Sequence, residues 1–270
     1  MKLSIRHQTV YRYAASQAYS IQQLHVTPRL EAQQSVLSWN LQAPGAVNAY
    51  TDAYGNRSHM LTLNEPHRTV AIVAEGVVQT TALYQGRLHN SEPLSPLVFT
   101  VPTRLTTPTD AVKDYAARHL GLARAGRADT TSMLTLAAAI RQSVTYTSGA
   151  TSVHTSGHDA MLLGAGVCQD HAHLFLACCH ALGVPARYVS GYIDPGSSGH
   201  AASHAWVDAW VIDSDFEGWI SIDVTHARLM SHAYCRLAIG RDYDSAAPVR
   251  GSRRGAGDET MAVEVLIVPV

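Results

Sequence analysis

The sequence has no large excess of charge of either sign. Its 270 residues include 20 basic and 21 acidic side chains, which gives a formal net charge of −1. A chain so close to neutral creates no strong field to attract nucleic acid or an anionic membrane surface. We therefore expect no nucleic-acid partner and no membrane partner, and a small neutral patch or substrate is the default ligand.

Long apolar runs and cysteines are also scarce. No stretch approaches the ~20 apolar residues that a membrane-spanning helix needs. Residues 1–7 alternate polar and apolar side chains and lack the apolar run of a signal peptide. Among the four cysteines, Cys178 and Cys179 are adjacent, which is an awkward arrangement for a disulfide framework. These absences predict reduced thiols and a cytoplasmic location.

The pattern of residues 1–100 predicts an antiparallel β-domain. Short alternating runs at 2–13, 35–41 and 69–79 are separated by turn-forming clusters at 43–45 and 52–56. This spacing is typical of a β-sandwich or barrel. No titratable cluster stands out in this part, so we expect it to be structural or to shape the substrate site.

The composition changes after a proline-rich linker at 90–108, and the remainder predicts an α+β domain. Asp110 is placed to cap the first helix of this domain. An Arg- and Gly-rich segment at 252–257 is expected to be a mobile surface turn. The expected helices cover 109–120, 130–144 and 168–182, and the expected strands cover 186–192, 204–211, 219–224 and 261–268.

Cys168 is the strongest candidate nucleophile in this domain. It follows a glycine-containing turn and precedes an apolar helix, so it should lie at the helix N-terminus. Unpaired N–H groups and the positive end of the helix dipole stabilise a thiolate at such a position. Cys178 and Cys179 fall in the interior of the same helix and are expected to be buried. Gln169, in the first turn, is a candidate for substrate contact.

A thiolate nucleophile needs a base, and the base needs a group that orients it. His204 begins a strand whose hairpin partner is 218–224, and a register with Val211 opposite Gly218 makes Asp223 its diagonal neighbour. Asp208 is four residues from His204, about 13 Å at ~3.3 Å per residue. Asp213 and Asp215 are expected at the far end of the hairpin. The pairing of His204 with Asp223 depends on this register, because a slip of one residue would turn them to opposite faces.

Other residues could complete the cleft. Trp206 and Trp219 are expected either to pack in the core or to form walls of a substrate cleft. The backbone N–H of Cys168 is the obvious oxyanion donor, and Tyr146 is a candidate for the second donor.

A zinc site built on Cys168, His171 and His173, or on His200 and His204, is the competing interpretation. His171 and His173 are about 200° apart around a helix, so they do not converge on one ion with Cys168. We therefore expect no metal and no cofactor.

Several blocks of sequence together resemble the transglutaminase-like superfamily and, more narrowly, bacterial transglutaminase-like cysteine proteases with an N-terminal β-domain. The blocks are G-V-C-Q-D at 166–170, L-G-V-P-A-R-Y-V-S-G-Y at 182–192, H-A-W-V-D at 204–208 and G-W-I-S-I-D-V-T at 218–225. Weaker matches lie at 9–13, 28–29, 52–56, 239–243 and 247–251, so the resemblance covers nearly the whole chain.

The resemblance implies a β-sandwich domain at 1–100 and a papain-like or transglutaminase-like α+β core with a C-terminal strand at 101–270. Carried over, it makes Cys168 the nucleophile, His204 the base and Asp223 the orienting acid. The expected chemistry is hydrolysis of a peptide or other amide substrate through a thioester. Transfer of the acyl group to an amine, as in a transglutaminase, and a non-catalytic scaffold of the same fold are the alternatives.

Overall fold

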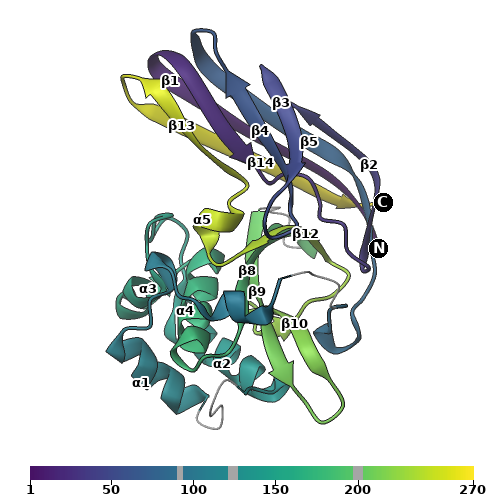
Figure 1. Cartoon of the computed structure of the whole chain (residues 1–270), viewed down its shortest axis with the longest axis vertical. Helices are drawn as coiled ribbons and strands as arrows, with labels where there is room; N and C mark the ends of the chain where they lie inside the picture. The colour runs from purple at the N-terminus through teal and green to yellow at the C-terminus, as the bar shows by residue number, and fades with distance from the viewer. Residues whose placement is uncertain (90–93, 121–126, 197–202) are drawn as a thin grey trace.

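A computed structural model describes residues 1–89, 94–120, 127–196 and 203–270. A β-domain lies above a core of helices and a second sheet in the view of Figure 1. The two ends of the described chain lie side by side, because Leu3 near the start of the first strand is opposite Pro269 at the end of the last.

The β-domain is one curled sheet of seven strands, all paired antiparallel. The long strand β1 passes through both halves of the curl. Its residues 2–13 pair with β5 and β14, and its residues 17–24 pair with β4 and β13. Both halves contribute side chains to one apolar cluster. The strands are β1 (Lys2–Leu24), β2 (Gln34–Gln42), β3 (Ala46–Thr51), β4 (Arg57–Leu63), β5 (His67–Thr80), β13 (Val249–Gly255) and β14 (Glu259–Pro269).

The two strands nearest the C-terminus, β13 and β14, hydrogen-bond to β1 of the β-domain and not to strands of the core. The final strand that the sequence predicted within the core therefore belongs to the first sheet. Residues 252–255 of the expected mobile turn are part of β13. These pairings join residues at least 225 positions apart, and local patterns carry no signal for a partner so distant.

The core combines helices with a five-stranded antiparallel sheet of order β11-β10-β9-β8-β12. The predicted α+β fold class, with its N-terminal β-domain, is confirmed. The helices are α1 (Asp110–His119), α2 (Thr130–Ser143), α3 (Gly157–Leu163), α4 (Cys168–Ala181) and α5 (Tyr243–Ala246). The sheet strands are β8 (Ala186–Ile193), β9 (Ser203–Ile212), β10 (Glu217–Asp223), β11 (Arg228–Leu229) and β12 (Tyr234–Gly240); β6 (Thr145–Tyr146) and β7 (Ala165–Gly166) form a short parallel pair.

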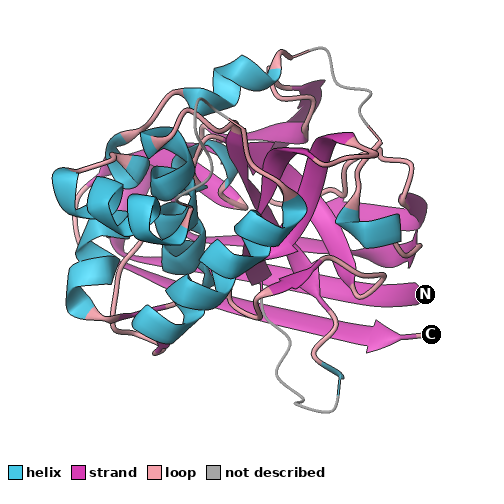
Figure 2. Ribbon diagram, turned by 90° about the horizontal axis from the view of Figure 1, so that it is seen from below, coloured by secondary structure: helices cyan, strands magenta, loops and turns pink. Residues whose placement is uncertain are grey.

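Helix α4 is buried along almost its whole length and lies between the other helices and the sheet. Most of the helical segments lie on the left of the molecule in Figure 2. The cap of α1 differs from the prediction, because the side chain of Thr109 accepts the N–H of Val112, and Asp110 is the first helical residue. Threonine is the better cap here, since a capping side chain must precede the first helical residue.

Successive residues of β9 and β10 alternate between the two faces of the sheet. Val207 and Ile220 face the helices and join the larger apolar cluster. Trp206 and Trp219 face the other way and pack with Phe99, which lies in the segment that connects the two domains. His204, Asp208 and Asp223 fall on this second face, as the hairpin pattern predicts.

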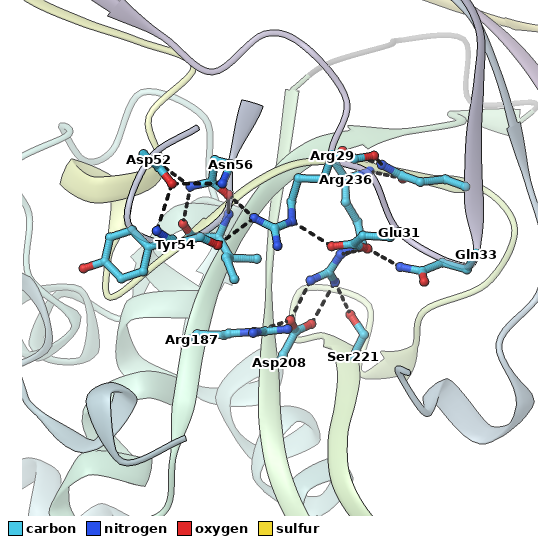
Figure 3. Close-up of polar contacts among 12 residues, drawn as sticks. Arg29, Glu31, Gln33, Asp52, Tyr54, Asn56, Arg187, Asp208, Ser221 and Arg236 are labelled. Carbon is cyan, nitrogen blue, oxygen red and sulfur yellow. Dashed lines mark hydrogen bonds and ion pairs between the residues drawn. The ribbon is translucent and has the colours of Figure 1, made fainter. Parts of the chain in front are cut away.

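A buried ionic network fastens the β-domain to the core (Figure 3). Arg236 of β12 is fully buried and binds Asp208 through two nitrogens, with N–O distances of 2.8 and 2.6 Å. Its Nε lies 2.8 Å from Glu31, which follows β1 in the β-domain and also accepts from Arg29 at 2.8 Å. Because unpaired charges at this depth are costly, the network couples the position of one domain to the other.

The structure describes all four cysteines, and each is a free thiol. Cys168 is partly exposed, whereas the other three are buried. Among the described residues, no helix has both the length and the apolar character needed to cross a membrane.

Candidate active site

Cys168 is the first residue of α4, and Val167 is the cap. The carboxylate of Asp170 folds back over this turn, where its Oδ2 accepts from Val167 N at 2.8 Å and from Thr151 Oγ1 at 2.6 Å. Gly166 makes this approach possible, because a Cβ at this position would lie 2.8 Å from the Asp170 side chain. The turn holds the Cys168 thiol at the helix N-terminus, where free N–H groups and the dipole favour an anion.

His204 and Asp223 meet as the hairpin register requires. Gly218 lies opposite Val211, as the sequence predicts, and the register continues toward His204 at the same end of the hairpin. The distance from His204 Nε2 to Asp223 Oδ2 is 2.8 Å. This contact uses Nε2, so Nδ1 is the ring nitrogen left for the Cys168 thiol.

Asp223 is fully buried and accepts four hydrogen bonds. Its Oδ2 lies 2.7 Å from His226 Nδ1 and accepts the Tyr234 hydroxyl at 2.6 Å, in addition to His204. Its Oδ1 accepts the backbone N–H of His226 at 3.1 Å. Burial alone would raise the pKa of Asp223, but the hydrogen bonds from His204 and His226 hold it well below its usual range.

Burial and hydrogen bonding have opposite effects on the pKa of His204. Burial alone would lower the pKa of this imidazole, but hydrogen bonds to Asp223 and to Cys168 raise the pKa to about 10. The arrangement therefore favours an imidazolium bonded to the Asp223 carboxylate and within reach of the Cys168 thiol.

The other acids of the hairpin do not reach the imidazole, in agreement with the sequence argument. Asp208 binds Arg187 and Arg236. Asp213 accepts from Thr130 at the opposite end of the hairpin, and Asp215 pairs with Arg87.

Two cavities meet at His204. One, of about 270 Å³, is lined by Cys168 and Gln169, and the other, of about 520 Å³, extends past His226. Tyr146 and His204 line both cavities, and Tyr146 is 56% exposed. Gln169 and Tyr146, which the sequence analysis names as candidate cleft residues, therefore line a cavity beside His204. Burial raises the pKa of Tyr146, and a negative charge on Cys168 raises it further, which puts the phenol within electrostatic reach of the thiol.

The two tryptophans proposed as cleft walls lie in the core and not in the cleft. Trp206 is fully buried, stacks on His204 and donates from Nε1 to Ser221 Oγ at 3.0 Å. Trp219 is 2% exposed and packs on Phe99 and under the Arg187 guanidinium. Their large apolar surfaces fill the face between the sheet and the interdomain segment, where burial is more favourable than exposure.

The sequence-based zinc groups do not come together. His171 contacts Thr225 Oγ1 at 3.0 Å and the Val144 carbonyl at 2.9 Å, whereas His173 accepts from the backbone N–H of Tyr243 at 3.1 Å. His200 lies outside the described residues. Within the described ranges, His204, Asp223 and His226 are close enough to share a metal ion. Both imidazoles already bond to the same Asp223 oxygen, so an ion would have to replace those hydrogen bonds.

Sequence reasoning missed His226 and Tyr234 as partners of Asp223. His226 is three residues beyond the acid, a spacing that allows its N–H and ring to turn back on the carboxylate. Tyr234 comes from β12 and depends on tertiary structure, so no local signal indicates its role.

Comparisons with known proteins agree with the resemblance drawn from the motifs. Residues 3–79 match the model of the bacterial transglutaminase-like N-terminal region, and residues 117–224 match that of the transglutaminase-like superfamily. A solved structure from Cytophaga hutchinsonii, named "Putative Cysteine Protease", superposes with a TM-score of 0.76. It is 24% identical and the match covers 100% of this chain and 91% of the other, so it supports the shared fold.

Two mycobacterial relatives match most of the chain. An uncharacterized protein of Mycobacterium leprae is 30% identical over 98% of both chains. An uncharacterized protein of Mycobacterium tuberculosis H37Rv is 32% identical over 92% of this chain and 86% of its own. With the matching family models, these relatives show that the chain belongs to the transglutaminase-like superfamily, in the bacterial group that carries an N-terminal β-domain.

Proposed function

We propose that this protein hydrolyses an amide bond through a thioester on Cys168. The observation that carries the proposal is the chain of contacts from Cys168 through His204 to Asp223, with the pKa of His204 raised to about 10. An imidazolium beside a thiol at a helix N-terminus favours the thiolate, which is the reactive form of cysteine. Membership of a superfamily with thiol chemistry supports the same assignment.

The reaction would proceed in two balanced halves. The Cys168 sulfur attacks the amide carbonyl, His204 gives its proton to the departing amine, and a thioester remains. Water then attacks the thioester while His204 takes the proton, which releases the acid and restores the Cys168 thiolate beside the His204 imidazolium. Asp223 keeps the imidazole oriented and stabilises its charge in both halves.

The tetrahedral oxyanion would be stabilised by the N–H of Cys168, which has no carbonyl partner within the helix. Tyr146 is the best candidate for a second donor, since its phenol lines both cavities at His204. In this proposal the Tyr146 hydroxyl donates a hydrogen bond to the reacting oxygen. Tyr146→Phe removes that hydroxyl and would test its role.

An acyl-enzyme experiment tests the proposed function without knowledge of the natural substrate. The protein is treated with p-nitrophenyl acetate, quenched in acid and digested, and the acetyl group is located by mass spectrometry. The expected result is acetylation at Cys168 in the wild type and none in Cys168→Ala, with Cys178→Ala as the matched control that loses a buried thiol. Acetylation at the amino terminus, Lys2 or Lys113, with Cys168 unmodified, would contradict the proposal.

A second assay separates hydrolysis from the alternative acyl transfer. A glutamine-containing peptide mixture is incubated with the protein and a fluorescent primary amine. New amino termini or conversion of glutamine to glutamate indicates hydrolysis, and incorporation of the amine indicates a transglutaminase reaction. If neither occurs although Cys168 acetylates, the fold serves some other acyl donor, and if Cys168 fails to acetylate, a non-catalytic scaffold is favoured.

A further inference from the structure

The two cavities that meet at His204 differ in charge. The larger cavity, here named the cationic half, is lined by the guanidinium groups of Arg141 and Arg228 and by the imidazole of His226. Asp194 is the carboxylate in its lining. The smaller cavity, here named the neutral half, has tyrosine, serine and proline side chains around Cys168 and His204, and the described residues add no carboxylate, guanidinium or further imidazole to its lining.

Both arginines of the cationic half are held in place without being neutralised. Arg228 donates from Nε to the Tyr234 hydroxyl at 3.1 Å, and that hydroxyl donates to Asp223. Arg141 reaches from α2 and donates from Nη1 to the His226 carbonyl at 3.2 Å. Within the described residues, neither guanidinium forms an ion pair. Each keeps further N–H donors, because a guanidinium has five.

The structure sets these two arginines apart from the buried ones. Arg187 and Arg236 are both paired with Asp208, where their charge is compensated inside the protein. Arg141 and Arg228 are exposed, line a cavity and are anchored to neutral oxygens. A planar guanidinium held in this way matches the geometry of a carboxylate, the anion that arginine binds with two parallel hydrogen bonds.

We propose that the cationic half binds a carboxylate of the amide substrate, next to the bond that Cys168 attacks. This inference rests on the proposed function and names its substrate class: acidic amides, whose carboxylate is either the free end of a peptide or an acidic side chain. It also replaces the expectation of a neutral substrate, because a net charge of −1 for the whole chain does not report how charges are paired locally.

Two alkylating reagents of similar size provide the test. Iodoacetate and iodoacetamide both transfer a small group to the sulfur, but only iodoacetate carries a carboxylate. The ratio of their rates at Cys168 is measured by peptide mass spectrometry at one pH and one ionic strength. Each of Arg141→Met and Arg228→Met is expected to lower this ratio by about threefold to tenfold, since removal of a nearby unit charge weakens attraction of the anion. The iodoacetamide rate in the same variant corrects for any change in the thiol itself.

Matched variants test whether the effect depends on the positive charge and on its position in the cationic half. Arg141→Lys and Arg228→Lys should keep most of the ratio, and added salt should lower the ratio in the wild type. Arg12→Met removes one exposed positive charge from β1 and should leave the ratio unchanged.

The outcomes distinguish failure of this inference from failure of the proposed function. If Cys168 reacts faster than Cys178 with iodoacetamide, but the Met variants keep the wild-type ratio, the carboxylate site is overturned and the thiol chemistry stands. If Cys168 reacts no faster than Cys178, both fail.

Blocked tripeptides then identify the source of the carboxylate by protecting Cys168 from iodoacetamide. Stronger protection by a peptide with an aspartate side chain indicates an acidic residue, and stronger protection by one with a free C-terminus indicates the terminal carboxylate. Equal protection by a neutral asparagine peptide with an amidated end would overturn the inference.

Discussion

Asp208 and Asp223 are two fully buried carboxylates on the same face of neighbouring strands, yet their partners differ in kind. Asp208 is paired with two arginines, which keep their charge at every physiological pH. Asp223 is paired with two histidines and a tyrosine, of which the histidines can exchange protons. Burial is the same in both cases, so the partners, not the depth, distinguish a structural acid from a candidate catalytic one.

The two networks also extend to different parts of the molecule. The Asp208 network lies away from the cleft and continues through Arg236 to Glu31 of the β-domain. The Asp223 network reaches the cleft through His204 and His226. Trp206 lies between them, with its ring on His204 and its Nε1 bonded to Ser221, which also accepts from Arg236. Because Trp206 and Ser221 join the two networks within the described residues, we expect that each network can be disturbed separately.

The largest effect is expected for Asp223→Asn, which removes the charge that stabilises the His204 imidazolium. Acetylation of Cys168 by p-nitrophenyl acetate should slow by about 10²- to 10⁴-fold, the range found when an orienting acid is lost. The measurement is the initial rate at pH 7. Asp213→Asn, in the same hairpin but bonded to Thr130, is the matched control and should retain the wild-type rate. A normal rate in Asp223→Asn would remove this residue from the proposed mechanism.

Asp208→Asn should affect stability instead of reactivity. The substitution removes the carboxylate charge that Arg187 and Arg236 share and leaves Arg236 its ion pair with Glu31; breaking a buried pair in this way costs about 3–5 kcal/mol. Burial alone would raise the pKa of Asp208, but Arg236 and Arg187 lower it to about 2, in keeping with a permanently charged network. Urea unfolding would measure the loss of free energy. A loss below about 1 kcal/mol, or a loss of Cys168 reactivity in the folded variant, would erase the distinction between the two acids.

The dependence of stability on pH should differ between the networks. The folded pKa of His204, about 10, lies above its ordinary value of 6.5. Its contribution to stability is therefore complete below about pH 6.5 and is lost as the pH rises toward 10. The unfolding free energy of the wild type should exceed that of His204→Asn by a margin that shrinks across this window, by a few kcal/mol at most. A margin independent of pH would show that His204 gains no proton affinity on folding.

The smallest effect is expected for Tyr234→Phe, which removes one of the donors to Asp223 and leaves the others. A hydrogen bond to a buried carboxylate contributes about 1.5–3 kcal/mol, and we expect Cys168 acetylation to fall by roughly tenfold. Tyr192→Phe is the matched control, because the Tyr192 hydroxyl is also buried but bonds to His7 between the domains. If the two variants lose stability equally and neither changes the acetylation rate, Tyr234 is a structural residue only.

The parts of the site that could be predicted from the sequence are those that depend on residues close together in the chain. The position of Cys168 follows from a turn and a helix start, and the contact between His204 and Asp223 follows from one hairpin register, which the structure confirms. Both features involve residues near each other in the chain, where periodicity and turn signals are informative.

The remaining features depend on pairing between distant segments. Tyr234 reaches Asp223 only because β12 joins the sheet beside β8. β13 and β14 complete the first sheet from the other end of the chain. Trp206 and Trp219 fit a core and a cleft equally well by composition, and their burial is decided by the interdomain segment that covers them.

The most direct test of the account is the alkylation of Cys168 by iodoacetamide as a function of pH, in the wild type and in His204→Ala. We predict that wild-type Cys168 is alkylated rapidly at pH 6, whereas the buried Cys178, Cys179 and Cys235 are not, because the His204 imidazolium stabilises its thiolate. His204→Ala should slow the reaction at pH 6 by at least about tenfold, which corresponds to the loss of one charged partner. Labelling of Cys168 no faster than that of Cys178, or an unchanged rate in His204→Ala, would contradict the account.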